Sequence, residues 1–381
     1  MTGAVFVSLD DFTREGFTNG LFLHVRELLR RVTARGHPAT LACIAQRRDP
    51  EIERRTSTVQ GCAVQEVFIA APASTSAYRR ALRDLLDELD PAVVLLNSCA
   101  VRLDEAHPAV LDECLTSGRQ VAVLVTDQLY PTGHDHPTEE VRRYYRLLRQ
   151  ASVHAVSRTI ADALHSQTGV SAQVLPNLLP GRRVGPPPPE AEDRFLTLIN
   201  HHPIKGRRVW DALIRQRPGD AYLVVETWPD APPYAPPSPH VRVAPFTPDP
   251  TTIYHRTRIL LVPSLGPEGL PRVALEAMES GVPVVAHRIG SLPELGDAAM
   301  FVTPPPIAGH ELDEDTVLYP VVSPSDIERA ARELGRAIDA IDQDPALRTR
   351  LVARGRAYVR DYRDHSEAVS GRLLDAWFGT V

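Results

Sequence analysis

Residues 260–294 read LLVPSLGPEGLPRVALEAMESGVPVVAHRIGSLPE. The apolar run from Ile259 to Val262 predicts a buried strand, and a turn rich in glycine and proline follows it. Pro271 suits the first position of a helix because it lacks an N–H, and Gly281 suits its end. A second strand is expected from Val282 to Ala286. This order predicts a βαβ unit whose first turn lies at the carboxyl edge of a parallel sheet.

The turn before this helix carries groups that suit a phosphate and a sugar. The N–H groups near Arg272 and Val273 form the positive end of the helix dipole, which favours a phosphate. Glu268 precedes the helix, and Glu276 leans back toward the same turn because helical side chains tilt to the N-terminus. Carboxylates accept hydrogen bonds from sugar and ribose hydroxyls. Two isolated glutamates would instead fit a solvated helix face and a surface turn.

The whole stretch resembles the Glu-x7-Glu segment of family 4 glycosyltransferases. The resemblance rests on Pro263-Ser264, Glu268-Gly269-Leu270-Pro271, Glu276-Ala277-Met278, Ser280 to Val285 and Leu292-Pro293-Glu294. It implies the α/β GT-B fold, in which two Rossmann-like domains with doubly wound parallel sheets face each other across a cleft. It also implies transfer of a sugar from a nucleotide donor with retention of configuration. The implied donor-binding residues here are Glu268, Gly269, Leu270, Pro271, Arg272, Val273 and Glu276, with Glu268 also catalytic.

The composition is that of an ordinary globular protein with two or three domains. The 381 residues are 43% apolar and 24% charged, and the net charge of −6 argues against a nucleic-acid partner. No 18-residue apolar run and no signal peptide are evident, so we expect a cytoplasmic protein without membrane association. The four cysteines are expected to be reduced and buried: Cys43, Cys62, Cys99 and Cys114.

The sequence contains a single lysine. Lys and Arg total 42, and all but Lys205 are arginine. Lys205 is therefore a candidate for a place that needs a compact ammonium. Lys205-Gly206 resembles the end of the family's Arg-x4-Lys-Gly motif, which holds the donor diphosphate, and Asn200 stands where the arginine is usual. A second base would come from Arg207, Arg208 or Arg272, although each also fits a solvated helix face.

Two segments of the N-terminal half resemble family motifs, one that contributes donor-binding residues, Asn19 and Gly20, and one on the acceptor side. Asn19-Gly20 matches the glycine-rich loop, where backbone N–H groups approach a phosphate or an acceptor. The segment from Val123 to His134 resembles one whose histidine lies beside the reacting sugar, and Asp127 occupies the place of that histidine. Asp127 is equally suited to accept a proton or orient an acceptor, and to cap a turn. His134 is a second acceptor-side candidate.

Alternating apolar runs and helix-period segments predict two α/β domains. The expected boundaries are an N-terminal domain over 1–180, a Pro-rich linker over 181–192, a nucleotide-sugar domain over 193–360, and a helix over 361–381 that crosses back. Helices are expected over 325–342 and 344–361, and the final helix runs to Phe378. Predicted strands are 4–9, 39–45, 64–70, 92–97, 121–126, 153–156, 172–175, 195–199, 222–226 and about 240–247.

Two further segments complete the C-terminal half. Phe246 lies in a segment that brackets the nucleotide base in the family. Residues 304–320 are expected to be irregular. Their acidic run, Asp313 to Asp315, is interpreted as a solvated loop, so no metal site is expected.

The sequence therefore predicts a metal-independent transferase that moves a sugar from a UDP- or GDP-sugar to an acceptor hydroxyl. The implied catalytic groups are Asp127, Lys205 and Glu268. A small polar natural product is the suggested acceptor, which would place the enzyme in natural product biosynthesis. Two alternatives remain: a non-catalytic GT-B partner of another transferase, favoured by Asn200 and Asp127, and a nucleotide-sugar epimerase.

Overall fold

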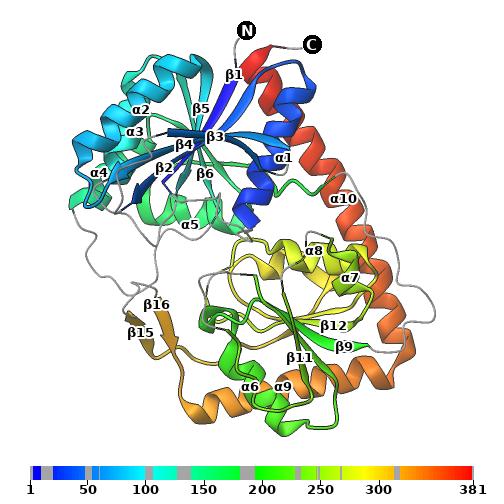
Figure 1. Cartoon of the computed structure of the whole chain (residues 1–381). Coiled ribbons are helices and arrows are strands. Elements are labelled where there is room, and N and C mark those ends of the chain that lie inside the picture. The colour runs from blue at the N-terminus through cyan, green and yellow to red at the C-terminus, as the bar shows by residue number, and fades with distance from the viewer. Residues whose placement is uncertain are drawn as a thin grey trace. The chain divides into compact units, whose positions relative to one another are not determined.

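The computed structural model describes residues 3–9, 20–47, 54–59, 61–98, 106–126, 139–180, 194–227, 233–245, 247, 249–266, 268–312 and 318–379. Contacts divide the chain into two compact units (Figure 1). Within the described residues, unit 1 holds 3–9, 20–179 and 365–379, and unit 2 holds 180–364. The linker expected at 181–192 lies outside the described residues.

Unit 1 contains an eight-stranded sheet in the order β3-β4-β2-β1-β5-β6-β7-β8. All neighbours are parallel except β3 and β4. The strands are β1 (Gly3–Ser8), β2 (Ala39–Arg47), β3 (Arg54–Val59), β4 (Cys62–Ala70), β5 (Pro91–Ser98), β6 (Gln120–Val125), β7 (Ser152–Ala155) and β8 (Gln173–Val174). The helices are α1 (Gly20–Ala34), α2 (Thr75–Leu89), α3 (Ala106–Thr116), α4 (Glu139–Leu148) and α5 (Arg158–Thr168).

Helices cover both faces of this sheet. Val5 and Val7 of β1 share one hydrophobic cluster with side chains of α2, α3, α4 and α5. Successive strand residues point to opposite faces, so Phe6 lies on the other side, where α1 contacts β1 and β2. Both faces being buried explains why these strands read as continuous apolar runs.

Unit 2 contains a six-stranded parallel sheet in the order β11-β10-β9-β12-β13-β14. The strands are β9 (Phe195–Ile199), β10 (Tyr222–Val225), β11 (Val241–Ala244), β12 (Thr257–Val262), β13 (Val284–His287) and β14 (Met300–Val302). The helices are η2 (Pro203–Lys205), α6 (Arg207–Gln216), α7 (Thr251–Tyr254), α8 (Arg272–Glu279), η3 (Leu292–Ala298), α9 (Pro324–Gln343) and the first part of α10 (Pro345–Phe378), which belongs to unit 1 from His365 on. In Figure 1, α6 and α9 lie side by side, and their side chains form one core with β9.

The α/β fold class with two doubly wound parallel sheets is confirmed, and several element predictions are wrong. The segment expected to be irregular, 304–320, contains an antiparallel pair, β15 (Gly309–Leu312) and β16 (Leu318–Val321). The two helices expected after residue 344 form one, α10, because neither Gly355 nor Gly371 interrupts the backbone pattern. The predictions also missed β3 and β14. None of the helices in the described ranges has the length and apolarity needed to span a bilayer.

Three of the four cysteines fall in the described ranges. Cys43, Cys62 and Cys114 are free and buried, as predicted. Burial raises the pKa of the Cys62 thiol, which keeps it protonated and inert. Cys99 lies outside the described residues.

A buried histidine makes unit 1 sensitive to acid. His154 is 2% exposed, its Nε2 lies 2.9 Å from Ser152 Oγ, and its ring meets Trp377 edge-on. Burial lowers the pKa of His154 to about 4. Because this folded-state pKa lies below the ordinary value, the unfolded chain takes up the proton first, and stability falls as the pH drops from about 6.5 to about 4.

We therefore expect the stability of unit 1 to fall less steeply with decreasing pH in His154→Phe than in wild type, by up to about 1.4 kcal/mol per pH unit. Thermal unfolding between pH 7 and pH 4.5 measures the slope. His165→Gln, at an exposed position on α5, is the matched control and should leave it unchanged. An identical slope in His154→Phe and wild type would contradict the prediction.

Candidate active site

Two loops of unit 2 meet at the switch point of its sheet. β9 is the first strand of the unit, and the next strands along the chain lie on opposite sides of it, β10 on one and β12 on the other. In open α/β sheets, ligands bind outside the carboxyl ends of the strands at such a point. The loop after β9 contains Lys205, and the turn after β12 contains Glu268.

Lys205 and Glu268 form an ion pair across these loops. Lys205 Nζ lies 2.8 Å from Glu268 Oε1 and 2.7 Å from Oε2. Ser264 Oγ also donates to Glu268 Oε1 at 2.6 Å. The Glu268 side chain is 10% exposed and that of Lys205 is 29% exposed, so the pair is partly withdrawn from water. Charged hydrogen bonds of this kind are stronger than neutral ones.

The chain folds tightly where these loops touch. Gly206 has a φ of +90°, and a Cβ there would lie 2.0 Å from the carbonyl oxygen of Pro263. Leu265 N donates to the carbonyl of Ile204 at 2.8 Å. The glycine after Lys205 therefore lets the lysine loop lie directly against the turn that carries Glu268.

A second glycine fixes Glu268 from the other side. Gly290 has a φ of +57°, and a Cβ there would lie 2.4 Å from the backbone nitrogen of Glu268 and 2.5 Å from its carbonyl oxygen. Ser291 N donates to that carbonyl at 2.9 Å. The loop after β13 thus sets the backbone position of Glu268.

The predicted phosphate cradle is the start of α8. Pro271 is the N-cap and the helix begins at Arg272, so the expected first helical position was one residue early. Among the described residues, no side chain caps this end with a hydrogen bond. Leu270 is buried, and Gly269 and Val273 are half-buried beside it. The positive end of the helix dipole therefore begins four residues after Glu268 in the chain.

Glu276 makes no contact with Lys205 or Glu268 among the described residues. It instead contacts buried side chains near the start of α8. Its Oε2 accepts a hydrogen bond from Tyr254 Oη at 3.0 Å, and its Oε1 lies 3.7 Å from Arg272 Nε. Arg272 is 6% exposed, so the expectation of a solvated helix face is wrong for it. Burial raises the pKa of Glu276, while Arg272 and Tyr254 oppose that rise.

Sequence reasoning missed Tyr254. It is 1% exposed and lies 22 positions before Glu276 on the short helix α7, so no local spacing connects the two. Its hydroxyl is also 3.2 Å from the carbonyl of Val273 in the first turn of α8.

Asn200 has a local structural role. Its φ is +69°, and its Oδ1 accepts a hydrogen bond from His202 N at 2.9 Å. Asparagine tolerates this left-handed backbone better than most residues do. Of the proposed alternative bases, Arg207 lies 3.6 Å from Asp211 and stacks over Tyr234, whereas Arg208 is exposed.

Of the remaining predicted positions, only Gly20 lies among the described residues. Gly20 is exposed at the start of α1 in unit 1. Four candidates lie outside the described residues: Asn19, Asp127, His134 and Phe246. Within the described ranges, no three His, Cys, Asp or Glu side chains gather as metal ligands.

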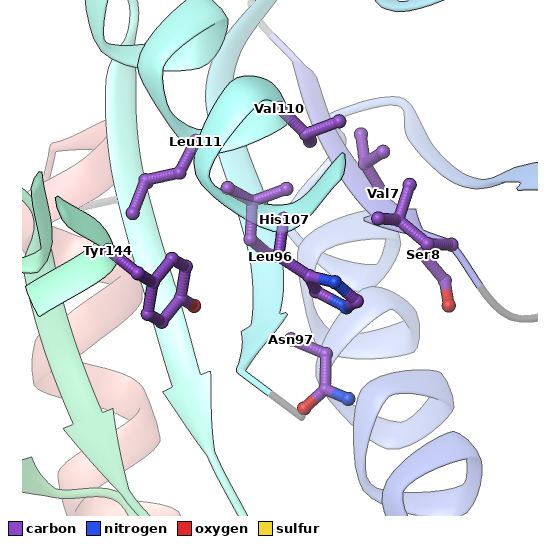
Figure 2. Close-up of a pocket in the computed structure, with 9 residues that line it drawn as sticks. Val7, Ser8, Leu96, Asn97, His107, Val110, Leu111 and Tyr144 are labelled. Atoms are coloured by element: carbon purple, nitrogen blue, oxygen red, sulfur yellow. The ribbon is translucent and has the colours of Figure 1, made fainter. Parts of the chain in front are cut away.

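Unit 1 has a small cavity at its own switch point. Between β1 and β5 the strand order reverses, and a cavity of about 20 Å³ lies at their carboxyl ends. Figure 2 shows the His107 ring beside the Asn97 amide, with Ser8 at the end of β1 and Tyr144 on the far wall. Asn97 Oδ1 is buried with no hydrogen-bond partner among the described residues. The cavity holds about one water, so larger ligands would meet only its polar mouth.

Comparison with known proteins agrees with this architecture. Residues 209–311 match the family model described as glycosyl transferases group 1. Sucrose-phosphate synthase from Thermosynechococcus elongatus is 16% identical with a TM-score of 0.71, and the match covers 99% of each chain. Anabaena HepE in complex with UDP is 14% identical with a TM-score of 0.69, and the match covers 98% of this chain and 99% of HepE. No curated protein sequence matches the chain.

The trehalose-6-phosphate synthase OtsA is also similar, at 12% identity over all of both chains with a TM-score of 0.63. These structural relatives have the GT-B fold, and the alignments span nearly the whole chain, so this chain has the GT-B fold that its sequence predicted. The fold and the matched domain together support a nucleotide-sugar-dependent glycosyltransferase.

Gly290→Ala should displace Glu268, because the added Cβ would overlap backbone atoms that cannot rotate away. We expect at least a tenfold loss of donor turnover and a crystal structure with a shifted 268–269 backbone. Gly296→Ala is the matched control, since Gly296 also has a φ of +57° but no atom within 4 Å of a Cβ. Equal turnover in the two variants would contradict this role of Gly290.

Tyr254→Phe should destabilise unit 2 more at pH 8 than at pH 5. The raised pKa of Glu276 means that its charged form costs stability as the pH rises, and the Tyr254 hydroxyl reduces that cost. We expect a loss of about 1.5 to 3 kcal/mol at pH 8, the usual range for a hydrogen bond to a charged group. Thermal unfolding at both pH values measures it. In a Glu276→Gln background the pH dependence of the Tyr254→Phe effect should vanish.

Proposed function

We propose that the protein is a retaining, metal-independent glycosyltransferase similar to family 4, which moves a sugar from a UDP- or GDP-sugar to an acceptor hydroxyl. The observation that carries this proposal is the Lys205–Glu268 ion pair at the switch point of unit 2, beside the uncapped start of α8. An ammonium, a helix N-terminus and a carboxylate at one sheet edge match the charges and hydroxyls of a sugar diphosphate.

Each donor-side group has a defined task in this proposal. The bond from sugar C1 to the diphosphate breaks, and Lys205 and the first turn of α8 stabilise the negative charge that develops on the leaving diphosphate. Glu268 accepts hydrogen bonds from the sugar, and Glu276 accepts them from the ribose. The solved HepE complexes, with UDP and with UDP and glucose, support a nucleotide-sugar donor.

Retention follows in this proposal from the direction of attack. The acceptor hydroxyl attacks C1 on the face from which the diphosphate leaves, and its proton passes to the departing phosphate oxygen. No residue of the chain is assigned as a covalent nucleophile. The charge on the diphosphate is met by the ammonium and the helix dipole, so the proposed step requires no metal ion.

The acceptor is proposed to bind on unit 1, at the polar mouth of the cavity between β1 and β5. Asn97 and His107 supply hydrogen-bonding groups there, and Ser8 lies on the neighbouring strand. Groups that donate and accept neutral hydrogen bonds suit a small polyhydroxylated compound, such as a polar natural product. Asp127 and His134 keep their proposed acceptor-side roles.

One observation favours the alternative of a non-catalytic partner protein. Asn200 replaces the motif's first base, and its side chain oxygen is used to shape the loop instead. A protein that binds a nucleotide without turning over its sugar would tolerate that loss.

Lys205→Ala should lower turnover of the donor about 10² to 10³-fold, the usual effect of removing a group that stabilises developing charge. Calorimetry with UDP and GDP followed by donor hydrolysis assays with several UDP- and GDP-sugars measures binding and turnover separately. Arg208→Ala is the matched control, because this exposed cation lies three residues away.

A wild-type rate in Lys205→Ala with every donor would show that the site is assigned wrongly. Nucleotide binding by the wild type without any turnover, even with a panel of polyhydroxylated acceptors, would support the partner protein instead. The anomeric configuration of a transfer product, read by NMR, decides between retention and inversion.

A further inference from the structure

A buried histidine outside the proposed chemistry contacts the turn that carries Glu268. His287 is the last residue of β13 and is fully buried. Its Nδ1 lies 2.9 Å from the carbonyl oxygen of Ser264. A carbonyl only accepts hydrogen bonds, so Nδ1 carries the proton and donates. Burial lowers the pKa of His287 to about 4, so the ring is neutral at ordinary pH, which fits this tautomer.

The peptide group that His287 contacts is held at both ends. The Ser264 carbonyl accepts from His287, and the N–H of the same peptide, on Leu265, donates to the carbonyl of Ile204 at 2.8 Å. Ile204 immediately precedes Lys205. This one peptide group therefore links β13 to the lysine loop, with the turn after β12 between them.

The same turn directs the side chain of Glu268. Ser264 is 1% exposed, and its hydroxyl donates to Glu268 Oε1 at 2.6 Å. A shift of the Ser264 backbone would move the hydroxyl that holds Glu268. It would also weaken the contact with Ile204, whose carbonyl accepts from Gly266 N at 3.2 Å as well.

The surroundings of the other ring nitrogen indicate that only the Nδ1 contact requires a histidine at this position. His287 Nε2 is buried with no hydrogen-bond partner among the described residues. A buried polar atom without a partner costs stability, and an apolar residue of similar size would avoid that cost. An apolar residue would, however, leave the Ser264 carbonyl without its donor.

We propose that His287 is a positioning residue, whose Nδ1–H fixes the Ser264–Leu265 peptide and thereby keeps Lys205 and Glu268 in the geometry of their ion pair. The catalytic part of this inference rests on the proposed function. The effect of His287 on the Ser264–Leu265 turn can be measured without any substrate.

Three variants separate positioning from simple core packing. His287→Leu removes the donor at similar size, His287→Asn restores an N–H donor at the Nδ1 position, and Val285→Ala weakens the same strand at a side chain that packs in the α6 and α9 core. We expect His287→Leu to lower kcat/KM for the donor at least tenfold and His287→Asn to stay within threefold of wild type. Val285→Ala should lower the thermal midpoint while keeping kcat/KM.

Hydrogen exchange of the Leu265 amide provides the readout that needs no activity. Exchange should accelerate at least tenfold in His287→Leu and stay near wild type in His287→Asn. Equal exchange and equal kcat/KM in His287→Leu and Val285→Ala would overturn the inference. If wild type neither binds UDP or GDP nor turns over a donor, the proposed function fails, and the exchange result alone still decides whether His287 holds the turn.

A double variant tests the route to Glu268. We expect the double variant His287→Leu with Ser264→Ala to lose less kcat/KM than the product of the two single fold-losses, if His287 acts through the Ser264 hydroxyl. Multiplicative losses would show that His287 does not act through that hydroxyl.

Discussion

The ion pair between Lys205 and Glu268 joins two loops that are separated by more than sixty residues of sequence. A partly buried charge is tolerated when an opposite charge and further hydrogen bonds replace its water. Glu268 obtains these from Lys205 and Ser264, and the close packing of Gly206 and Gly290 keeps the donors within reach. The two glycines and the pair therefore depend on each other, because neither loop would hold its charge in place without the close approach of the other.

This arrangement gives the site a defined electrostatic state. With the pair formed, Lys205 is attracted to Glu268, and the start of α8 has no side-chain cap from the part of the chain that the structure describes. In the proposed function, an incoming diphosphate would add negative charge near the ammonium and the helix terminus, and would compete with Glu268 for Lys205. In the proposed reaction, a carboxylate released in this way is free to accept a hydroxyl of the attached sugar, so binding of the two halves of the donor would be coupled.

The sequence was most informative where the chemistry is local. Strands buried on both faces were predicted because their apolar runs are continuous, whereas β3 was missed because its exposed residues, RRTSTV, carry no such signal. Lys205 and Glu268 were found from motifs whose members are close in sequence. Tyr254 and His287 were missed because their partners, Glu276 and Ser264, are brought to them only by the packing of neighbouring elements.

This geometry gives a physical reason why the one basic position that is not arginine is a lysine. An ammonium has three N–H donors on one nitrogen, and Lys205 directs its nitrogen at both oxygens of Glu268. In the proposed reaction the third donor would be free for a phosphate oxygen, so the ammonium could contact the diphosphate before its bonds to Glu268 break. A guanidinium paired side-on with Glu268 would present its remaining donors in a fixed plane on a larger group. A compact ammonium at this one basic position would therefore suit the proposed exchange of Glu268 for a diphosphate.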